Sequence, residues 1–575
     1  MTDDVVLTVE DLSLDFRLRT FILHAARNVS FSLKRGQTFC LVGESGSGKS
    51  VTARALLRLI DKNGTIVGGR ILLRNDDGTD IDIAGLNERS KQLLAIRGGR
   101  IGLIFQEPMS SLSPVHTIGS QIVEALRLHQ AMDKRQARAA TIELLRQVEI
   151  PDPERMIDRY TFEFSGGMRQ RAMIAMALAC NPDILIADEP TTALDVTTQA
   201  EILDLIKRLQ QSRGMAMLLI THDMGVVAEV ADEVAVMRFG QIVEQGSVDD
   251  IFHDARHPYT RQLLASTVKL EQDRRALMHP AGPEPTTGGA DPVLSVRNLT
   301  KVYGGFGGLF RRSDYAIKAV DDVSFDLFAG ENLGIVGESG SGKTTLGRLI
   351  LRTVEPTSGS VIYADRTGRP VEVTKLGRRD MRAFHRDVRL VFQDPFASLN
   401  PRMTVKDVVG DPLFVSGLAH GAKLEQRVAE LLTLVGIDPQ AMERYPHAFS
   451  GGQRQRIGIA RALALDPRII IADEATAALD VSIRSQILDL LLDIQKRLNL
   501  SFIFISHDIG VVRYFCDRVA VMHRGKVVEM GPAEQICTAP EEAYTRSLIS
   551  AVPNPDPRNK RMMHRTRYSK PAPAH

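Results

Sequence analysis

Cysteine is scarce in this sequence and follows no pattern. The chain of 575 residues contains four cysteines, and none of them stands in the C-x-x-C spacing that zinc sites use. They are Cys40, Cys180, Cys516 and Cys537. Small secreted domains rely on paired cysteines in place of a large core, and nothing here suggests such pairs. The sequence therefore predicts no zinc site and no disulfide framework, and it favours a reducing compartment.

Long apolar runs are also missing. No uncharged apolar run reaches the roughly 18 residues that a membrane-spanning helix needs. The first four residues include two aspartates, and no apolar stretch with a small-residue cleavage site follows them. We therefore expect a chain that is not secreted, that stays on the cytoplasmic side, and that meets a membrane only through partner proteins.

Neither sign of charge dominates. The chain has 72 basic and 70 acidic residues and a formal net charge of +2, so no field of one sign would steer it onto nucleic acid. Hydrophobic residues make up 43% and charged residues 25%, as in soluble globular proteins. At about 150 residues per domain, the length leaves room for two domains with subdomains. We expect two packed units and no nucleic acid partner.

What the sequence does contain is an internal repeat. Residues 42–50 read VGESGSGKS, and residues 336–344 read VGESGSGKT. Further matching texts follow in the same order: Phe105-Gln106 with Phe392-Gln393, FSGG at 164–167 and 449–452, ADE at 187–189 and 472–474, and Thr221-His222-Asp223 with Ser506-His507-Asp508. The repeat indicates gene duplication and fusion.

Composition sets the expected boundaries of the two halves. Between the halves the text becomes charged and then rich in Pro and Gly, which is typical of a linker, and the end of the chain has the same character. We expect a first domain at 1–267, a linker at 268–291, a second domain at 292–551 and a flexible tail at 552–575.

Within each half, strand and helix patterns alternate. Short apolar runs at 38–42, 184–187 and 217–220 predict buried, mainly parallel strands of an α/β domain. Ile202, Leu205, Ile206 and Leu209 recur on the single apolar face of a helix. From Gln106 to Ser165 the patterns are helical, including one at about 136–148, which predicts an inserted helical subdomain, and residues 394–449 repeat it.

Each glycine-rich loop follows an apolar strand and opens a helix. In that context backbone N–H groups and the helix N-terminus bind the phosphates of a nucleotide. Lys49 and Lys343 would reach the β- and γ-phosphates of ATP, and the hydroxyls of Ser50 and Thr344 would ligate Mg²⁺. Two matches in equivalent contexts make an accidental Gly-rich turn the weaker interpretation. The predicted nucleotide-binding residues are Gly43, Glu44, Ser45, Gly46, Ser47, Gly48, Lys49 and Ser50, and Gly337, Glu338, Ser339, Gly340, Ser341, Gly342, Lys343, Thr344 and Thr345.

Two buried-strand sequences, ILIADE and IIIADE, end in adjacent carboxylates. This arrangement is costly unless a cation or hydrogen bonds receive the charges. Because neighbouring strand residues point to opposite sides, Asp188 and Asp473 would face Mg²⁺ while Glu189 and Glu474 orient the attacking water. A solvated acidic strand end is the alternative.

His222 and His507 each end an apolar strand run, at the edge where open α/β sheets bind ligands. Because both halves present it, we favour contact with the γ-phosphate over a core or capping histidine. Gln106 and Gln393 also end apolar strand runs; taken alone, a glutamine there would more often be a loop residue.

With phosphate loop, glutamine, Ser-Gly-Gly, Asp-Glu and histidine in this order, both halves resemble the nucleotide-binding subunits of ABC transporters. The resemblance implies two ABC-type P-loop ATPase domains that close head to tail around two ATP molecules. Glu189 and Glu474 would be the catalytic carboxylates, Gln106 and Gln393 the Q-loop sensors beside Mg²⁺, and Asp195 and Asp480 the D-loop residues. The signature residues Ser165, Gly166, Gly167 and Met168 would face Lys343, and Ser450, Gly451, Gly452 and Gln453 would face Lys49.

The resemblance also assigns adenine stacking to Tyr303 and, in the first half, to Phe16. Departures from the family pattern are mild. Met168 stands where glutamine is usual, and Ala475 replaces the proline found as Pro190, so we expect a looser turn after Glu474. Both composite sites nevertheless have their catalytic groups.

More narrowly, the texts GESGSGK, QDPFASLNPR at 393–402, HPYTR at 257–261 and YTR at 544–546 look like the dipeptide, oligopeptide, glutathione and nickel importer branch. This implies two transmembrane permease subunits, a periplasmic solute-binding protein and a peripheral place on the cytoplasmic face of the inner membrane. Many members carry a cysteine-rich C-terminal extension that can bind an iron–sulfur cluster. Both halves are expected to stop short of it, so no cluster is predicted.

Other classes fit less well. Tandem ABC proteins of the ribosome have a long charged helical linker, and DNA-repair relatives have zinc cysteines or coiled coils. Export instead of import stays open from the motor residues alone, as do the solute, the permeases and the equality of the two ATP sites.

Overall fold

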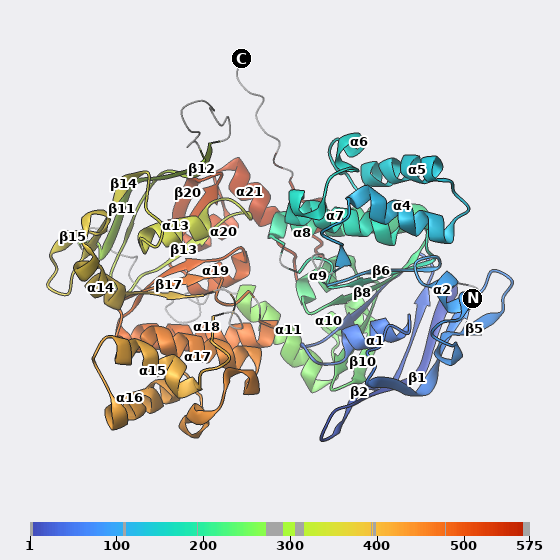
Figure 1. Ribbon diagram of the computed structural model, residues 1–575, viewed down its shortest axis with the longest axis horizontal. Coiled ribbons are helices and arrows are strands. Elements are labelled where there is room, and N and C mark those ends of the chain that lie inside the picture. The colour runs from blue at the N-terminus through green and yellow to red at the C-terminus, as the bar shows by residue number, and fades with distance from the viewer. Residues whose placement is uncertain are drawn as a thin grey trace, which may run out of the picture. The chain divides into compact units, whose positions relative to one another are not determined.

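The computed structural model describes residues 4–106, 111–192, 194–271, 291–304, 316–392, 394, 398–477, 479–566 and 568. The chain divides into two compact units (Figure 1). The first unit comprises Met1–Thr267 and Ser550–Arg565, and the second comprises Val268–Ile549 and Thr566–His575. Each unit is described below by itself.

The central layer of the first unit is a six-stranded sheet in the order β10-β9-β3-β8-β7-β6. Its strands are β3 (Thr38–Val42), β6 (Ile101–Ile104), β7 (Ile184–Asp188), β8 (Ala216–Thr221), β9 (Glu233–Arg238) and β10 (Gln241–Ser247). All neighbours are parallel except β9 and β10, and every residue of β3, β7 and β8 is buried. These three strands coincide closely with the predicted apolar runs, so the α/β prediction is confirmed.

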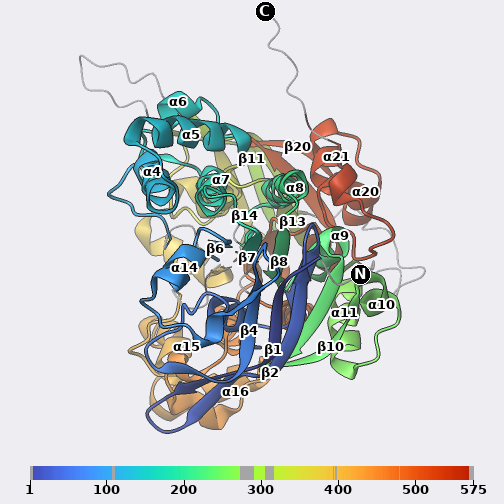
Figure 2. The same cartoon turned by 90° about the vertical axis from the view of Figure 1, so that its right-hand side faces the viewer.

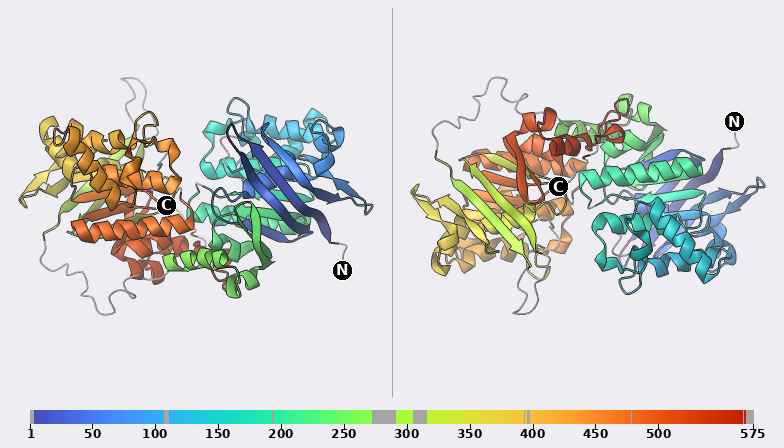
Figure 3. Two further views of the ribbon diagram at one scale, coloured as in Figure 1. Left: turned by 90° about the horizontal axis from the view of Figure 1, so that it is seen from below. Right: turned by 90° about the horizontal axis from the view of Figure 1, so that it is seen from above.

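A second sheet, which the sequence analysis did not predict, covers one face of the first. It is antiparallel, in the order β2-β1-β4-β5, and consists of β1 (Val5–Arg17), β2 (Ile22–Lys34), β4 (Gly64–Arg74) and β5 (Asp80–Asp82). One apolar cluster joins residues of both sheets, including Leu14, Ile71 and Leu41. Figure 3 shows this sheet face on in blue, and its yellow-green counterpart in the second unit. The site-bearing strands are therefore enclosed on this face.

The first two helices of this unit pack into the same apolar cluster as the antiparallel sheet, and the later helices cover the other face of the six-stranded sheet. The helices are α1 (Lys49–Ala55), α2 (Lys91–Ile96), α4 (Ile118–His129), α5 (Lys134–Gln147), α6 (Pro153–Met156), α7 (Gly166–Ala177), α8 (Val196–Arg213), α9 (Met224–Val230), α10 (Val248–His253) and α11 (Pro258–Glu271), with short 3-10 turns η1 (Ile83–Gly85) and η2 (Thr161–Glu163). Figure 2 shows α4, α5 and α6 gathered away from the antiparallel sheet, which confirms the inserted helical subdomain. The helix predicted from Ile202, Leu205 and Ile206 is α8.

The second unit repeats this architecture with the same strand orders. Its sheets are β12-β11-β14-β15 and β20-β19-β13-β18-β17-β16. The strands are β11 (Leu294–Tyr303), β12 (Ile317–Leu327), β13 (Asn332–Val336), β14 (Ser358–Ala364), β15 (Pro370–Glu372), β16 (Val388–Val391), β17 (Ile469–Asp473), β18 (Ser501–Ile505), β19 (Arg518–His523) and β20 (Lys526–Pro532). The helices are α13 (Lys343–Ile350), α14 (Arg378–Asp387), α15 (Val405–Val415), α16 (Gly421–Leu434), α17 (Gly451–Leu463), α18 (Val481–Leu498), α19 (Ile509–Phe515), α20 (Ala533–Thr538) and α21 (Ala543–Ser550), with turns η3 (Val373–Lys375), η4 (Pro439–Glu443) and η5 (Pro446–Ala448).

The C-terminal residues differ from the expected flexible tail. Residues 550–565 belong to the first unit and include the turn η6 (Met562–His564). The buried Oε1 of Glu229 accepts hydrogen bonds from the backbone N–H groups of Asn554, Arg561 and Met562, at 2.9–3.1 Å. The Met562 side chain is fully buried in the core of this unit. The sequence did not indicate this packing, because residues 550–565 are rich in Pro and Arg.

The expected linker at 268–291 begins inside a helix, because α11 continues to Glu271. Residues 272–290 lie outside the described residues. Across the ranges that the structure describes, no helix has both the length and the apolar character to cross a membrane.

Candidate active sites

The two phosphate loops have nearly identical backbones. Gly43 and Gly48 have φ values of 149° and 102°, and Gly337 and Gly342 have values of 150° and 105°, which side-chain-bearing residues rarely adopt. A Cβ at Gly43 would lie 2.2 Å from the Met237 carbonyl oxygen. Glycine is therefore required here both for conformation and for space.

The lysine of each loop is buried and held by its own loop. Lys49 Nζ donates hydrogen bonds to the carbonyl oxygens of Gly43 at 2.7 Å and Glu44 at 2.8 Å. Lys343 Nζ makes the same two bonds to Gly337 and Glu338, also at 2.7 and 2.8 Å. Each ammonium group is thus fixed at the concave face of a loop that opens a helix, where an anionic phosphate would meet it.

A hydroxyl and a buried carboxylate meet at the predicted metal position. Ser50 Oγ donates to Asp188 Oδ1 at 2.8 Å, and Thr344 Oγ1 donates to Asp473 Oδ1 at 3.2 Å. Burial raises the pKa of both aspartates. The hydrogen bond from the hydroxyl opposes this rise, and the charge of the adjacent glutamate adds to it. Hard oxygen ligands beside a carboxylate that is costly to bury fit a cation such as Mg²⁺, which takes one or two protein ligands and oxygens of phosphate and water.

Glu189 lies among three polar side chains of the first unit. His222 Nδ1 lies 3.1 Å from Oε1, Gln106 Nε2 donates to Oε2 at 2.9 Å, and Thr192 Oγ1 donates to Oε2 at 3.0 Å. Burial opposes ionisation of Glu189, but the hydrogen bond and charge of His222, the Thr192 bond and the charge of Lys49 outweigh it and lower its pKa to about 2. The carboxylate is therefore ionised at any physiological pH.

The second unit shows the same pair. His507 Nδ1 lies 3.2 Å from Glu474 Oε1. Both glutamates are in the left-handed region, with φ values of 47° and 48°, and both donate their N–H to the next strand, to Ile220 and Ile505, at 2.9 Å. Residues other than glycine in this region are strained and gather at functional sites. Gln393 lies outside the described residues.

The turn after each glutamate closes in the same way. The N–H of Thr192 bonds the Glu189 carbonyl at 3.2 Å, and that of Ala477 bonds the Glu474 carbonyl at 3.1 Å. The hydrogen bond that closes the turn is thus no longer in the second unit than in the first, and the looser turn expected from Ala475 stays a prediction. Sequence reasoning missed Thr192, although its replacement by Ala477, one of two differences between ADEPTTALD and ADEATAALD, was a usable signal.

A pocket of about 450 Å³ opens at the second phosphate loop. Its lining includes Lys343, Thr344 and Glu474 together with Ile317 and Arg524. The loop lysine, the hydroxyl and the glutamate predicted to be catalytic therefore share one opening. Tyr303, at the end of β11, is 43% exposed, whereas Phe16 is partly buried against the core of the first unit. Of the two aromatic rings predicted to stack on adenine, that of Tyr303 is the more accessible.

The signature serines each begin a helix. Ser165 Oγ accepts the N–H of Met168 at the start of α7, and Ser450 Oγ accepts the N–H of Gln453 at the start of α17, both at 3.3 Å. Gln453 Oε1 in turn accepts the Ser450 N–H at 3.0 Å, a reciprocal cap that Met168 cannot make. The N–H groups at such helix starts are suited to bind an anion.

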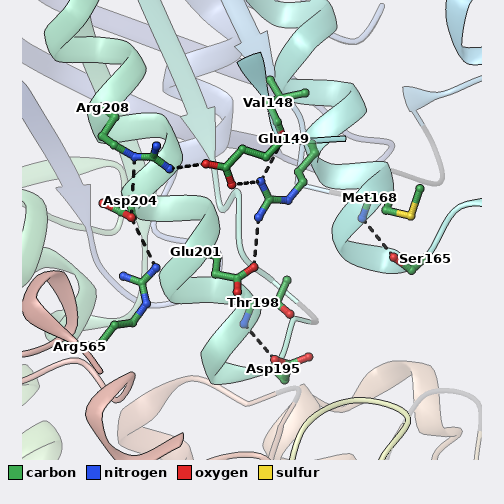
Figure 4. A network of polar contacts seen from close by, with 11 residues as sticks. Val148, Glu149, Ser165, Met168, Asp195, Thr198, Glu201, Asp204, Arg208 and Arg565 are labelled. Carbon is green, nitrogen blue, oxygen red and sulfur yellow. Dashed lines mark hydrogen bonds and ion pairs between the residues drawn. The ribbon is translucent and has the colours of Figure 1, made fainter. Parts of the chain in front are cut away.

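The signature and D-loop helices of the first unit are joined by ion pairs (Figure 4). Arg171 on α7 contacts Glu149 at 2.8 Å and Glu201 on α8 at 3.1 Å. Arg208 on α8 also contacts Glu149, at 2.8 Å. Asp195 caps α8 by accepting the N–H of Thr198 at 2.9 Å. The predicted signature and D-loop residues therefore sit at the starts of two connected helices.

Comparison with known families also describes the end of each half. The family model of the oligopeptide/dipeptide transporter C-terminal region matches residues 243–291 and 528–575. Both halves therefore continue into this C-terminal region. The matched segments contain one cysteine, Cys537, and the expectation that both halves stop short of a cysteine-rich extension stays a prediction.

The chain is similar along nearly its whole length to curated proteins. Glutathione import ATP-binding protein GsiA of Shigella boydii serotype 4 (strain Sb227) and that of Escherichia coli (strain K12) are each 49% identical over 572 residues, which is 97% of this chain and 91% of theirs. The ABC transporter family model matches residues 26–192 and 320–477, each containing a phosphate loop and its Asp-Glu pair. The chain therefore belongs to the ABC transporter family and is an ATPase with two nucleotide-binding domains.

Proposed function

We propose that this chain is the energy-coupling ATPase subunit of an importer for peptides, namely dipeptides, oligopeptides or glutathione-like solutes. The observation that carries the proposal is the similarity to proteins named for glutathione import, which spans 97% of this chain and 91% of theirs. The match to the oligopeptide/dipeptide transporter C-terminal region in both halves supports the same solute class.

The proposed partners are two transmembrane permease subunits and a periplasmic solute-binding protein. The chain would attach to the cytoplasmic face of the inner membrane through the permeases alone. Its near balance of charge, with a formal net charge of +2, supports the absence of a nucleic acid partner.

In the proposed reaction, ATP is bound with Mg²⁺ by the phosphate loops. Ser50 and Asp188, and likewise Thr344 and Asp473, would hold the cation, with Gln106 and Gln393 beside it; bound Mg²⁺ neutralises charge on the phosphates. Lys49 and Lys343 would orient the β- and γ-phosphates.

Glu189 or Glu474 would orient a water and accept its proton. The bond from the water oxygen to the γ-phosphorus forms, the bond to the β-phosphate oxygen breaks, and ADP and phosphate leave. His222 and His507, which lie against these glutamates, would hold them and contact the γ-phosphate.

Each ATP would be completed by the signature of the other half, Ser450 to Gln453 at Lys49 and Ser165 to Met168 at Lys343. The serine-capped helix starts support this role, because their N–H groups would cap the γ-phosphate. Adenine would stack on Tyr303 and on Phe16. No iron–sulfur cluster is proposed, since Cys537 stands alone in the matched C-terminal segments.

The test is to tag the N-terminus, because residues 550–565 are packed into the first unit, and to identify what co-purifies in mild detergent. Two polytopic permeases and ATP-dependent uptake of labelled glutathione or dipeptide into vesicles holding the assembly would support the proposal. A Glu189→Gln, Glu474→Gln double variant is the control for ATP-driven uptake. Co-purification with ribosomes, or solute movement outward from the cytoplasmic face, would contradict it.

A further inference from the structure

The HPYTR text and its YTR counterpart have no place in the reaction described above. In the structure they begin the helices α11 and α21. The tyrosines Tyr259 and Tyr544 are buried, with 2% and 4% of their surface exposed. A buried tyrosine hydroxyl requires a polar partner.

That partner is the phosphate loop in both units. Tyr259 Oη accepts the backbone N–H of Glu44 at 3.1 Å, and Tyr544 Oη accepts that of Glu338 at 3.2 Å. Each bond joins residues more than 200 positions apart, 215 in the first unit and 206 in the second. Two halves with different sequences have thus kept the same long-range contact.

The bonded N–H belongs to the peptide group that also orients the loop lysine. The peptide between Gly43 and Glu44 presents its N–H to Tyr259 and its carbonyl oxygen to Lys49 Nζ, at 3.1 and 2.7 Å. The tyrosine therefore fixes the plane of the peptide whose other end positions the ammonium group. Because Gly43 has a φ of 149°, this peptide has few steric limits of its own.

The same pair of hydrogen bonds exists in the second unit. The peptide between Gly337 and Glu338 bonds Tyr544 through its N–H and Lys343 through its carbonyl oxygen, at 3.2 and 2.7 Å. The lengths of the corresponding hydrogen bonds differ by no more than 0.1 Å between the two units.

Each tyrosine ring is itself held in place. The Arg238 guanidinium lies 4.5 Å above the Tyr259 ring, and His523 stacks on Tyr544 with ring centroids 4.0 Å apart and 12° between planes. In the first unit, the residues just before α11 are anchored to the sheet, because Glu244 on β10 accepts the N–H groups of Arg256 and His257 at 2.6 and 3.2 Å. The hydroxyl position is thus set by sheet and stacking residue together.

We propose that Tyr259 and Tyr544 are positioning residues for ATP binding, acting through the Gly-Glu peptide on Lys49 and Lys343. The proposal rests on the ATPase assignment and is independent of the import function. It assigns the C-terminal region that follows each sheet a role in holding the nucleotide site.

The test replaces tyrosine by phenylalanine, which keeps the ring and its stacking and removes the acceptor. To measure one site at a time, the lysine of the other site is replaced: Tyr259→Phe is combined with Lys343→Ala, and Tyr544→Phe with Lys49→Ala. Each double variant is compared with the corresponding lysine variant alone. We expect the Kd for Mg-ATP to rise about fivefold to tenfold, since a bond that positions a buried charge is lost. Without nucleotide, the melting temperature is expected to stay within a few degrees.

Tyr445→Phe, an exposed tyrosine in the helical insert, is the matched control and should leave the Kd unchanged. An unchanged Kd in both hydroxyl variants, or a fall in melting temperature with no change in Kd, would overturn the proposal. Binding is measured on the purified full chain, so a failure here is separate from a failure of the import assignment.

Discussion

The two glutamates proposed to be catalytic, Glu189 and Glu474, are held differently, although the chain around them follows the same path. Both have φ values near 48° and a histidine within 3.2 Å. In the first unit the text after the glutamate is PTT, and Thr192 bonds the carboxylate at 3.0 Å; in the second unit it is ATA, and Ala477 offers no hydroxyl. The strained backbone is thus common to both halves, while side chains that adjust the carboxylate have diverged.

The comparison of the two glutamates first requires that both nucleotide sites contribute to ATP hydrolysis. Glu189→Gln and Glu474→Gln, made singly, are each expected to lower ATP turnover at least about a hundredfold, because the carboxylate proposed to accept the proton is lost and the two sites are proposed to act together. Phosphate release by the purified chain measures this. Glu88→Gln, at an exposed glutamate outside the phosphate loops, is a matched charge control that should leave turnover unchanged. Near-normal turnover in either variant would show that its site is dispensable.

A second contrast concerns what completes each core. The first unit needs residues 550–565 from the far end of the chain, and Met562 lies fully buried beside α8. Met562→Ala should destabilise the first unit by about 2–5 kcal/mol, the usual range for a buried methionine. Hydrogen exchange resolved by peptide should show the loss in α8 and α9, while the second unit keeps its protection.

Lys560→Ala, at an exposed position of the same segment, is the control for that measurement. Equal loss of protection in both units would show that the segment supports the chain as a whole. No loss in α8 or α9 would mean that its packing adds nothing to stability.

The third contrast is the threonine after Glu189 against the alanine after Glu474, and substitutions can exchange these two residues. Thr192→Ala removes one of three polar contacts of Glu189 and should lower turnover about threefold, since water replaces an exposed hydroxyl at modest cost. Ala477 is also exposed and its turn has the same geometry, so a threonine fits there. Ala477→Thr should leave turnover unchanged or raise it.

These two variants are compared by single-turnover hydrolysis, which isolates the chemical step. Thr192→Ser, which keeps the hydroxyl, should retain wild-type rates. If the alanine and serine variants lose activity equally, the methyl group and not the hydrogen bond is what matters at this position.

Prediction from sequence placed the helix starts and strand ends correctly where their pattern is contiguous in the chain. The phosphate loops, Asp-Glu pairs and serine-capped helices are local patterns, and each stands where its strand or helix ends. The antiparallel sheet was missed because register shifts near Leu12 and Leu14 break the alternation of buried and exposed residues along β1. The packing of the C-terminal segment was missed because its anchor, Glu229, lies 333 residues from Met562.

The smallest contrast lies at the signature helices. Gln453 closes a reciprocal cap with Ser450, whereas Met168 leaves α7 with the serine half of that cap. Because Ser450 is exposed, its N–H finds water when the glutamine is lost, so Gln453→Met should cost no more than about 1 kcal/mol of local stability. Amide exchange at the first turn of α17 should rise by less than about tenfold, and the reverse change, Met168→Gln, should slow exchange at the start of α7.

ATP turnover separates the two ways in which this position can act. If the side chain at this position acts only by stabilising the helix start, both substitutions should alter turnover by less than about twofold, because the serine cap and the backbone N–H groups of the first turn stay in place. A change of tenfold or more in Met168→Gln, with unchanged exchange at α7, would mean that the side chain acts on the nucleotide directly. The methionine would then be a functional difference between the two sites, comparable to that between Thr192 and Ala477, and not a neutral replacement.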